Sequence, residues 1–279
     1  MKLILSEFAG ACYGVERALA LVEDAVHRPA PVHTLGPLIH NPQVVAELEA
    51  HGVQVAQRVD EVDEGVLVIR SHGVAPQVIE EARARGLTVV DATCPHVLKA
   101  QRAASNMRER GYTVVVVGES GHPEVESISA HAGAGAIVVQ TPAGLPDTLG
   151  SGSSSVGVVV QTTQAPEALE AIVDELRRRD ITYEVRDTIC SATRQRQEAA
   201  ARLARSVDCM LVVGGHNSGN TTRLYEICKA VCPDTHHIES PSEIDASWFV
   251  ASDITVGITA GASTPQEQIA SVVAALSGG

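Results

Sequence analysis

The chain has 279 residues, of which 44% are hydrophobic but only 3% aromatic, and its formal net charge is −13. A surface this acidic repels phosphate backbones and anionic lipids, which excludes a general binder of nucleic acid or of acidic membranes. With so few aromatic residues, the core must consist of Ala, Val, Leu and Ile, as in parallel sheets covered by helices.

The N-terminal segment and the apolar runs predict a cytoplasmic protein. Lys2–Leu5 is the one apolar stretch before Ser6 and Glu7, too short for the hydrophobic region of a secretory signal. No run approaches the roughly 18 apolar residues that cross a bilayer. We therefore expect the six cysteines to be reduced, metal-bound or catalytic rather than paired in disulfides.

Short apolar strands and amphipathic helices alternate along the chain. The expected strands are Lys2–Leu5, Val32–Leu35, Val66–Ile69, 87–90, Thr113–Val117, 136–139, Val156–Val160, 181–185, Cys209–Val213 and 253–258. The expected helices include 14–26, 98–110 and 193–206, together with others that open at Pro42, Pro76 and Pro166. This order predicts βα units with parallel sheets.

Three cysteines occupy the same kind of junction, where a strand leads into a helix. Cys12 follows the first strand, Cys94 follows the strand at 87–90, and Cys190 follows the strand at 181–185. In open α/β folds, ligands collect at this edge because strand ends and helix N-termini converge there.

The polar loops repeat with the cysteines. The same number of residues separates Cys12 from His40, Cys94 from His122 and Cys190 from Ser218. His40, His122 and Ser218 each lie in a loop rich in Gly, Pro or Asn. A second polar loop follows in each third of the chain, around 70–73, 161–163 and 259–263. We interpret this pattern as a threefold pseudo-repeat with one thiol and two polar loops per unit.

The repeat predicts three similar small α/β units with mostly parallel sheets around a pseudo-threefold axis. The units are expected at 13–94, 95–186 and 187–279, and the N-terminal strand within 1–12 is expected to join the sheet of the third unit. Three thiolates that meet at such an axis match three corners of a cubane iron–sulfur cluster and leave its fourth iron open to substrate. A structural zinc prefers four closed ligands, so three thiols favour a cluster or a catalytic metal.

The loops contain hydrogen-bond donors suited to a phosphate or diphosphate, because donors near helix N-termini can hold an anion even in an acidic protein. These candidates are His40, His72, His122, Thr162, Ser218, Asn220 and Ser263. Glu124 differs from them, since a carboxyl group beside a proline and near His122 stands where a proton donor is expected. Burial near an anionic substrate would raise its pKa and keep it protonated.

Eight ordered motifs span nearly the whole chain: CYGVERA at 12–18, GPLIHN at 36–41, SHGV at 71–74, DATCP at 91–95, GHPEVE at 121–126, QTT at 161–163, DTIC at 187–190 and TAGAS at 259–263. Together they resemble the IspH/LytB family, the 4-hydroxy-3-methylbut-2-enyl diphosphate reductases, which perform the last step of the non-mevalonate isoprenoid route.

The resemblance implies a 4Fe-4S cluster held by Cys12, Cys94 and Cys190, with the substrate at the open fourth iron. It also implies a diphosphate pocket made by His40, His72, His122, Ser218, Asn220 and Ser263. Thr162 resembles the partner of the substrate hydroxyl, and Glu124 resembles the proton source, with His122 beside it in the catalytic group.

In that family two electrons and two protons remove the hydroxyl group as water and give isopentenyl or dimethylallyl diphosphate. The electrons must come from outside, since no flavin or nicotinamide motif is present. The resemblance implies reduced ferredoxin or flavodoxin as the donor, and the densest positive run, 177–179, is a candidate docking site.

Two positions depart from the family pattern. Gly219 replaces a usual serine, so one hydroxyl contact to the diphosphate is lost or replaced by a backbone N–H. At 8–11 the sequence Phe-Ala-Gly-Ala replaces the usual Pro-Arg-Gly-Phe, which affects packing behind the cluster. Neither change removes an expected cluster ligand or the expected acid.

Two other functions remain open from the residues themselves. One is an iron–sulfur hydro-lyase or synthase on the same threefold plan, which removes water without net reduction. The other is a non-catalytic iron–sulfur or redox sensor, which leaves Glu124 and the diphosphate-type loops without a role.

The remaining conspicuous residues are expected to be structural. Cys209, Cys228 and Cys232 are predicted to be core residues, and Trp248 and Phe249 are predicted to pack in the C-terminal unit. His236 and His237 are predicted to lie on the surface, and 144–155 is predicted to be a surface loop.

Overall fold

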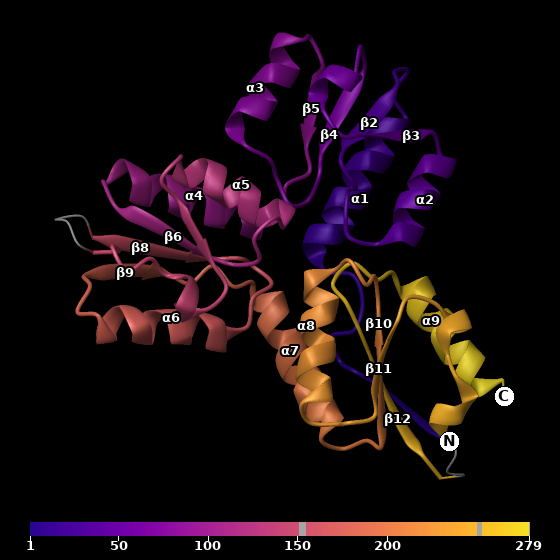
Figure 1. Cartoon of the computed structure of the whole chain (residues 1–279). Coiled ribbons are helices and arrows are strands. Elements are labelled where there is room, and N and C mark those ends of the chain that lie inside the picture. The colour runs from indigo at the N-terminus through magenta and orange to yellow at the C-terminus, as the bar shows by residue number, and fades with distance from the viewer. Residues whose placement is uncertain (151–154, 250–252, 279) are drawn as a thin grey trace. The chain divides into compact units, whose positions relative to one another are not determined.

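The computed structural model describes residues 1–150, 155–249 and 253–278. Over these residues strands and helices alternate, and the strands form three four-stranded sheets (Figure 1). Every strand pair in them is parallel. The expectation of an α/β fold with three similar units is therefore confirmed. Their arrangement around an axis stays a prediction.

The three sheets share one strand order. The first has the order β3 (Val53–Ala56), β2 (Val32–Leu35), β4 (Val66–Ile69), β5 (Thr88–Asp91). The second has β7 (Ile137–Val139), β6 (Thr113–Val117), β8 (Val156–Val160), β9 (Tyr183–Arg186). The third has β11 (Thr235–Ile238), β10 (Cys209–Val213), β12 (Thr255–Ala260), β1 (Lys2–Leu5).

Strand β1 takes the fourth place in the third sheet, the place that β5 and β9 take in the other two. It pairs in parallel with β12, so that Lys2 lies opposite Thr255 and Leu5 opposite Ile258. Each of the three cysteines thus comes directly after the outer strand of a sheet. The chain repeats one topology three times, with the last repeat completed by its own N-terminus.

The polar loops follow the two central strands of each sheet. The first strand of each repeat, β2, β6 or β10, becomes a central strand of its sheet. The next strand pairs with one side of it, and the third strand pairs with its other side. The strand order therefore reverses between the first and third strands, and such a switch point is where open α/β sheets bind ligands. The loops with His40, His122 and Ser218 follow first strands, and those with His72, Thr162 and Ser263 follow third strands.

Nine helices are found within the described ranges. They are α1 (Tyr13–Val26), α2 (Pro42–Ala50), α3 (Pro76–Ala84), α4 (Pro95–Glu109), α5 (Pro123–Ala132), α6 (Pro166–Arg178), α7 (Ser191–Ala204), α8 (Gly219–Lys229) and α9 (Gln266–Ser277). Five of them, α2 to α6, begin with proline, whose fixed φ suits the first helical position and whose missing N–H would be unpaired there in any case. None of the helices described is long and apolar enough to cross a membrane.

By compactness the chain divides into two units. Unit 1 comprises Met1–Glu16, His40–Val44 and Ser191–Gly279, and unit 2 comprises Arg17–Ile39 and Val45–Cys190. Unit 1 contains the third sheet, and unit 2 contains the first two. The division into three units at 13–94, 95–186 and 187–279 stays a prediction.

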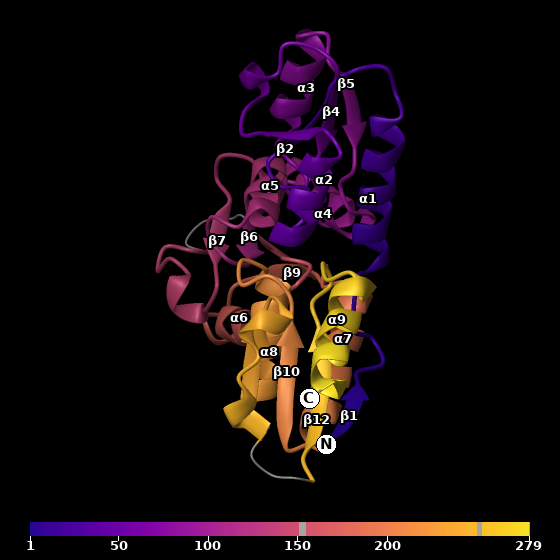
Figure 2. The same cartoon turned by 90° about the vertical axis from the view of Figure 1, so that its right-hand side faces the viewer.

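The core of unit 1 follows from alternation along β10. Cys209, Leu211 and Val213 face the side covered by α9, and Met210 and Val212 face the side covered by α7 and α8. Figure 2 shows α8 and α9 on opposite faces of this sheet. Because both faces are covered, the strand is apolar at every position.

The core of unit 2 uses the same alternation along β6. Val115 and Val117 pack with α6, whose Ile172 and Leu176 are fully buried, and Val116 packs with α4 and α5 on the other face. Burial of one such aliphatic side chain is worth roughly 1.5–3 kcal/mol. The first sheet of this unit packs in the same way against α3.

Some expected elements differ from the structure. β3 and β11 were not among the expected strands. In β3 a glutamine interrupts the apolar residues, and β11 has two histidines at its centre. Helix α4 begins at Pro95 rather than residue 98, because a proline can open a helix directly after Cys94.

The stretch 144–155 is only partly a surface loop. Leu145 and Leu149 are buried in the core beside α6. Strand β7 has only three residues, and the side chains of Leu145 and Leu149 add to the apolar core beside it. Residues 151–154 of the expected loop lie outside the described residues.

Candidate active site

Glu124 is a buried carboxyl group in the second sheet's half of unit 2. It is 2% exposed and lies in the first turn of α5, in the loop region after β6. Its Oε1 accepts a hydrogen bond from the backbone N–H of Thr162 at 2.6 Å, and its Oε2 accepts one from the Thr162 hydroxyl at 2.9 Å. The two switch-point loops of one sheet are thereby joined through a single carboxyl group.

Burial raises the pKa of Glu124 to about 7, and the hydrogen bonds from Thr162 oppose that rise without cancelling it. The negative charge of Glu119 adds to the increase. A carboxyl group with this pKa is protonated in a large fraction of molecules at neutral pH. Once protonated on Oε2, it can donate to the Thr162 hydroxyl rather than accept from it.

His122 caps the helix that carries Glu124. Its Nδ1 accepts a hydrogen bond from the backbone N–H of Glu124 at 3.1 Å. A nitrogen that accepts carries no proton, so this arrangement selects the neutral ring with its hydrogen on Nε2. The ring of His72 lies edge-on to it, with 5.6 Å between ring centroids. The structure therefore brings together two of the histidines that the sequence singled out.

Gln161 holds the two loops of this sheet in place, and its side chain was not among the predicted site residues. Its Oε1 accepts a hydrogen bond from the N–H of Glu119 at 2.9 Å, and its Nε2 donates to the Thr163 hydroxyl at 3.1 Å. The residue is 1% exposed. Its position next to Thr162 in the QTT motif was the available signal.

Arg70, in the loop after β4, is a second residue near the candidate site that was not among the predicted site residues. Its guanidinium lies across Gly36, where an added Cβ would come within 2.6 Å of Nη1. Burial lowers the pKa of Arg70 below its ordinary value, although the negative charge of Glu126 opposes this. It is the one basic side chain that adjoins the Ser71-His72-Gly73 motif in sequence.

Cys94 and Cys190 lie at helix starts in unit 2. Cys94 is the residue before α4, and its N–H donates to the Ser71 carbonyl at 2.9 Å. The N–H of Cys190 donates to the Thr162 carbonyl at 3.0 Å, directly before α7. Each thiol-bearing residue is therefore tied to the neighbouring switch-point loop. Both are half-buried.

Cys12 has the equivalent position in unit 1. Its N–H donates to the Ala262 carbonyl at 3.0 Å, in the loop after β12, and it directly precedes α1. No disulfide joins cysteines anywhere in the described parts of the chain. The assembly of Cys12, Cys94 and Cys190 around one cluster stays a prediction.

The aspartates before two of the cysteines order the backbone through hydrogen bonds to nearby N–H groups. Asp91 accepts a hydrogen bond from the Thr93 N–H at 2.9 Å, and Asp187 accepts one from the Ile189 N–H at 3.1 Å. Both are local turns that fix the approach to the cysteine.

The candidate diphosphate residues of unit 1 meet at the start of α8. Ser218 caps this helix, because its hydroxyl accepts from the Thr221 N–H at 3.3 Å. Asn220 is 6% exposed, and both polar atoms of its amide are buried without a hydrogen-bond partner among the described residues. Gly219 is the first helical residue, so its N–H belongs to the unpaired donors of the helix end.

His40 and Ser263 also meet in unit 1. The Ser263 hydroxyl donates to the His40 carbonyl at 3.1 Å, and the Asn41 amide donates to the Ser263 carbonyl at 2.9 Å. Asn41 is almost fully buried and caps α2 through its oxygen. The motifs GPLIHN and TAGAS, far apart in sequence, are thereby linked.

The candidate docking run 177–179 is less positive than its sequence indicated. Arg177 pairs with Asp174, and Arg178 and Arg179 both pair with Glu175, each at 2.6 Å. The hydrogen bonds from these two arginines lower the pKa of Glu175 to about 2, so this carboxylate stays charged. Two acidic groups thus offset much of the positive charge of the run.

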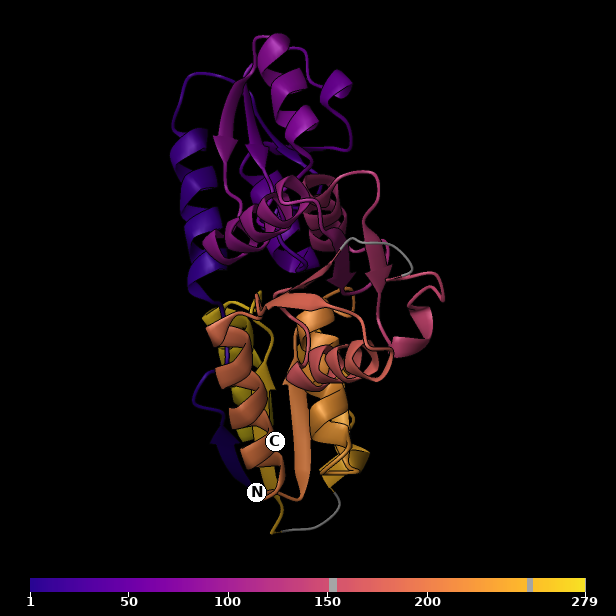
Figure 3. The same ribbon diagram turned by 90° about the vertical axis from the view of Figure 1, so that its left-hand side faces the viewer.

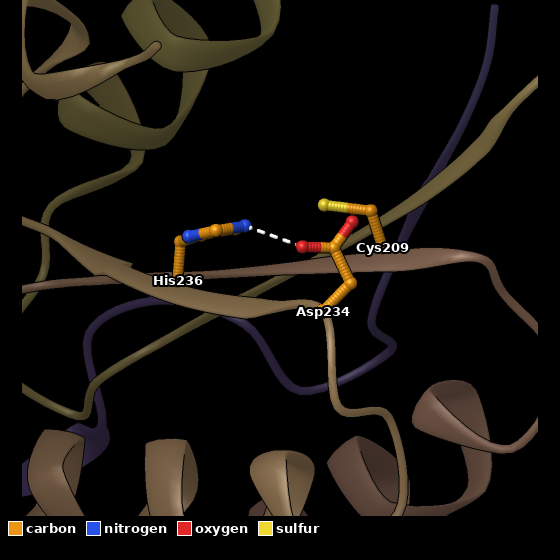
Figure 4. Close-up of side chains that lie close together, drawn as sticks. All are labelled: Cys209, Asp234 and His236. Carbon is orange, nitrogen blue, oxygen red and sulfur yellow. Dashed lines mark hydrogen bonds and ion pairs between the residues drawn. The ribbon is translucent and has the colours of Figure 1, made fainter. Parts of the chain in front are cut away.

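The cysteines that were predicted to be structural divide into two kinds. Cys228 and Cys232 are buried in the core under α8, as expected. Cys209 is also buried, but its sulfur, a carboxylate oxygen of Asp234 and a ring nitrogen of His236 all lie within 4.8 Å of one another (Figure 4). His236 is partly buried rather than a surface residue, because its ring stacks on Trp248.

The fold and these loops define an α/β protein of parallel sheets, with hydrogen-bond donors and a buried carboxyl group in switch-point loops and a cysteine at the start of a helix after the outer strand of each sheet. The sequence model of the family described as LytB protein matches residues 3–277, and the chain belongs to this family.

Similar proteins carry one description. A 4-hydroxy-3-methylbut-2-enyl diphosphate reductase of Pelobacter propionicus is 48% identical over 274 residues, which cover 95% of this chain and 94% of the relative. A protein of the same description from Geobacter metallireducens is 45% identical over 276 residues, with 98% and 96% covered.

Two solved structures are also similar. One, described as (E)-4-hydroxy-3-methyl-but-2-enyl diphosphate reductase, the terminal enzyme of the non-mevalonate pathway, is 41% identical with a TM-score of 0.73 and covers 100% of both chains. The E-1-hydroxy-2-methyl-but-2-enyl-4-diphosphate reductase of Plasmodium falciparum is 25% identical with a TM-score of 0.90, and 99% of this chain and 88% of that chain are covered.

Proposed function

We propose that this chain is an oxidoreductase that converts 4-hydroxy-3-methylbut-2-enyl diphosphate to isopentenyl and dimethylallyl diphosphate. Two electrons and two protons enter, the C–O bond of the allylic alcohol breaks, a C–H bond forms and water leaves. The observation that carries the proposal is the buried Glu124, which is hydrogen-bonded to Thr162 between two switch-point loops. The descriptions of the relatives supply the substrate.

Glu124 supplies a proton in this reaction. Its raised pKa keeps part of the population protonated at neutral pH, which a general acid requires. The Thr162 hydroxyl, within 2.9 Å of Oε2, can pass that proton on and can hydrogen-bond the substrate hydroxyl. His122, with its hydrogen on Nε2, is a neutral donor beside this pair.

The proposed ligands of the diphosphate are His40, His72, His122, Ser218, Asn220 and Ser263. Asn220 gives the strongest support, because a buried amide without partners in the described structure costs free energy unless a ligand pairs with it. The N-terminus of α8 adds backbone donors, including the N–H of Gly219, and a favourable dipole. Local donors of this kind can hold an anion on a chain with a net charge of −13.

Cys12, Cys94 and Cys190 would hold a 4Fe-4S cluster. The donor set fits, because the three thiols are half-buried and lie at helix starts, where the positive end of a helix dipole favours a negatively charged cluster. When bound, the cluster supplies electrons and an open iron as a Lewis acid. Reduced ferredoxin or flavodoxin in the cytoplasm is the expected source of those electrons.

Anaerobic reconstitution tests this proposal. Protein that is rebuilt with iron and sulfide should contain about four of each per chain. With a chemical reductant it should convert the hydroxylated diphosphate to the two isomers, and without reductant it should form no product.

Each other outcome has a distinct meaning. Water loss without reductant would replace the reductase with a hydro-lyase, and cluster assembly without any turnover would leave a sensor. The variant Glu124→Gln should assemble the same cluster and lose most of the rate, while Glu126→Gln, on the same helix, should retain it. A full rate in Glu124→Gln would remove the proposed proton source.

A further inference from the structure

We propose that Cys209, Asp234 and His236 form a second metal site, which binds one ion of the zinc class with water as the fourth ligand. The site lies wholly within unit 1. Cys209 begins β10 and Asp234 precedes β11, whereas the proposed diphosphate loop follows the opposite end of β10. The site is thus separate from the candidate active site of this unit.

Sheet register places the three side chains together. Met210 lies opposite Thr235, and Leu211 lies opposite His236, in parallel pairing. The same register brings Cys209 beside Asp234. Paired residues of neighbouring strands share a face, so the cysteine, the aspartate and the histidine all point to the side that α9 covers. The site therefore follows from the pairing of two adjacent strands, with Asp234 directly before the second of them.

The distances are close to those of a tetrahedral site. The sulfur, the carboxylate oxygen and the ring nitrogen lie within 4.8 Å of one another. Zinc bonds to sulfur, nitrogen and oxygen of about 2.0–2.3 Å would set the ligand atoms about 3.3–3.6 Å apart. Rotations of the three side chains can close this difference. The hydrogen bond from His236 Nε2 to Asp234 Oδ1, now 2.7 Å, would open as the ion enters between them.

The site combines a rigid interior with an open entrance. Cys209 is fully buried, and the His236 ring is held by parallel stacking on Trp248, with 3.7 Å between centroids and 7° between planes. The Asp234 side chain is 46% exposed and that of His236 is 21% exposed, which gives an ion access from solvent.

The donor types identify the ion. One thiol, one imidazole and one carboxylate make a mixed set that suits zinc, whereas magnesium and calcium prefer oxygen ligands alone. A hydrogen-bonded pair of His236 and Asp234 does not by itself require a nearby thiol, so the position of the Cys209 sulfur beside the pair supports a metal site. On binding, the thiol gives up its proton to solvent as the metal–sulfur bond forms.

Zinc X-ray absorption on the iron–sulfur-loaded protein tests the site directly. After addition of one equivalent of zinc, the zinc edge should show one sulfur at about 2.3 Å and the remaining nitrogen or oxygen ligands at about 2.0–2.1 Å. A shell of three sulfurs would place the zinc at the three proposed cluster cysteines and overturn the inference. The zinc edge does not depend on turnover, so its result is independent of the proposed function.

Variants test each ligand through chelator competition. Cys209→Ala, Asp234→Asn and His236→Ala should each weaken zinc binding, by more than about 100-fold for the cysteine and histidine variants, since even second-shell changes cost 10–100-fold. Cys228→Ala, which removes another buried thiol of the same unit, should bind zinc as the unaltered protein does. Asp234 and His236 are partly exposed, so substitutions there are expected to fold. These two variants test the site even if Cys209→Ala does not fold. Unaltered affinity in all three ligand variants would refute the site.

Discussion

Glu124 is the residue whose surroundings change its chemistry most. Burial raises its pKa to about 7, and Thr162 binds both of its oxygens. If the protonated form donates in the reaction, kcat/KM should be level at acidic pH and fall as pH rises through about 7. A pH–rate profile of the reconstituted protein, taken with a chemical reductant, measures this.

The variant Glu124→Gln separates the carboxyl group from other titrating groups. It should lower the rate by about 10²–10⁴-fold, as loss of a general acid does. The remaining activity of this variant should also no longer decrease as the pH rises through about 7. A Glu124→Gln profile that still falls at the same pH would assign the titration to another group.

The same pKa shift makes stability depend on pH. The pKa of Glu124 is about 7 in the folded chain against 4.5 for the ordinary group, so the folded state binds more protons between these values. Its contribution is fully present below pH 4.5 and is lost as pH rises through 7. The shift corresponds to roughly 3 kcal/mol. Thermal unfolding of the apoprotein at pH 5 and pH 8 should show a larger decrease for the unaltered protein than for Glu124→Gln.

Sequence reasoning could single out Glu124 because its carboxyl group stands beside a proline and two residues after His122, where a proton donor is expected. It could not find that Gln161 joins the loops, since that depends on Oε1 meeting the N–H of Glu119, far away in sequence. It assigned Cys209 to the core correctly but missed its neighbours Asp234 and His236, because the register of two strands decides that contact.

At the scale of elements, the start of α8 is both a helix cap and a candidate anion site. Ser218→Ala should remove the cap and cost about 1 kcal/mol of stability. It should also raise KM for the diphosphate substrate, because the same hydroxyl is a proposed ligand. Thermal unfolding and steady-state kinetics measure the two effects separately.

Two further substitutions at this position separate capping from binding. Asparagine caps a helix about as well as serine, so Ser218→Asn should restore the lost stability. Aspartate also caps, but its charge repels a diphosphate, and Ser218→Asp should be stable yet bind substrate poorly. Equal KM values for these two variants would argue against an anion at this helix end.

The loop after β4 is packed too closely for any side chain at Gly73. Its φ is 72°, and an added Cβ would come within 2.3 Å of Gln101 Nε2 and 2.9 Å of Ser127 Oγ. Those two groups are themselves hydrogen-bonded at 2.6 Å, and Ser127 donates to the Val74 carbonyl at 3.2 Å. The helices α4 and α5 thus fix the loop that carries His72.

Gly52 provides a matched control for this glycine. Its φ is 89°, but nothing lies within 4 Å of its added Cβ. Gly52→Ala should therefore cost about 1–2 kcal/mol, which is the backbone strain alone. Gly73→Ala should cost clearly more in denaturant unfolding, because the clash with Gln101 adds to the strain. Equal losses would show that the loop yields easily.

Strands with continuous apolar runs were predictable, whereas the polar strand β11 was not. β6, β8 and β10 have the expected bounds, because a run made mostly of apolar residues and bordered by turn residues reads as a buried strand. β11 has the sequence Thr-His-His-Ile, in which two histidines occupy central positions. Only its pairing with β10, visible in the finished sheet, makes it a strand.

At the scale of the whole molecule, the chain applies one strand order three times. The spacing from cysteine to polar loop made this visible, because equal topology places equal numbers of residues between equivalent loops. Spacing alone does not decide whether Cys12, Cys94 and Cys190 meet, and their assembly around one cluster stays a prediction.

The third sheet depends on its N-terminal strand. β1 pairs with β12, and Leu3 packs against the core beside α9. Removal of residues 1–5 should expose the edge of β12 and speed hydrogen exchange of its amides. The central strands of unit 2, β4 and β8, should keep their protection. Exchange measured by mass spectrometry on the full-length and shortened chains gives both values.

Two substitutions in β1 distinguish pairing from side-chain packing. Leu5 is 49% exposed, so Leu5→Ser should leave exchange in β12 nearly unaltered. Leu3→Ala removes a side chain that packs against the core. The β12 amides of this variant should exchange at a rate between those of the unaltered and the shortened chain. Unaltered exchange after loss of the whole strand would mean that β12 needs no partner on that side.

The pairing of β1 with β12 also governs how the protein can be made. Both termini belong to unit 1 and lie near each other in Figures 2 and 3. On a ribosome that adds about 5–20 residues per second, β12 emerges roughly 10–50 seconds after β1. β1 must therefore wait for its partner until all the residues between the two strands have been synthesised. Its four-residue length and its lysine help to keep it from pairing with other strands in that interval.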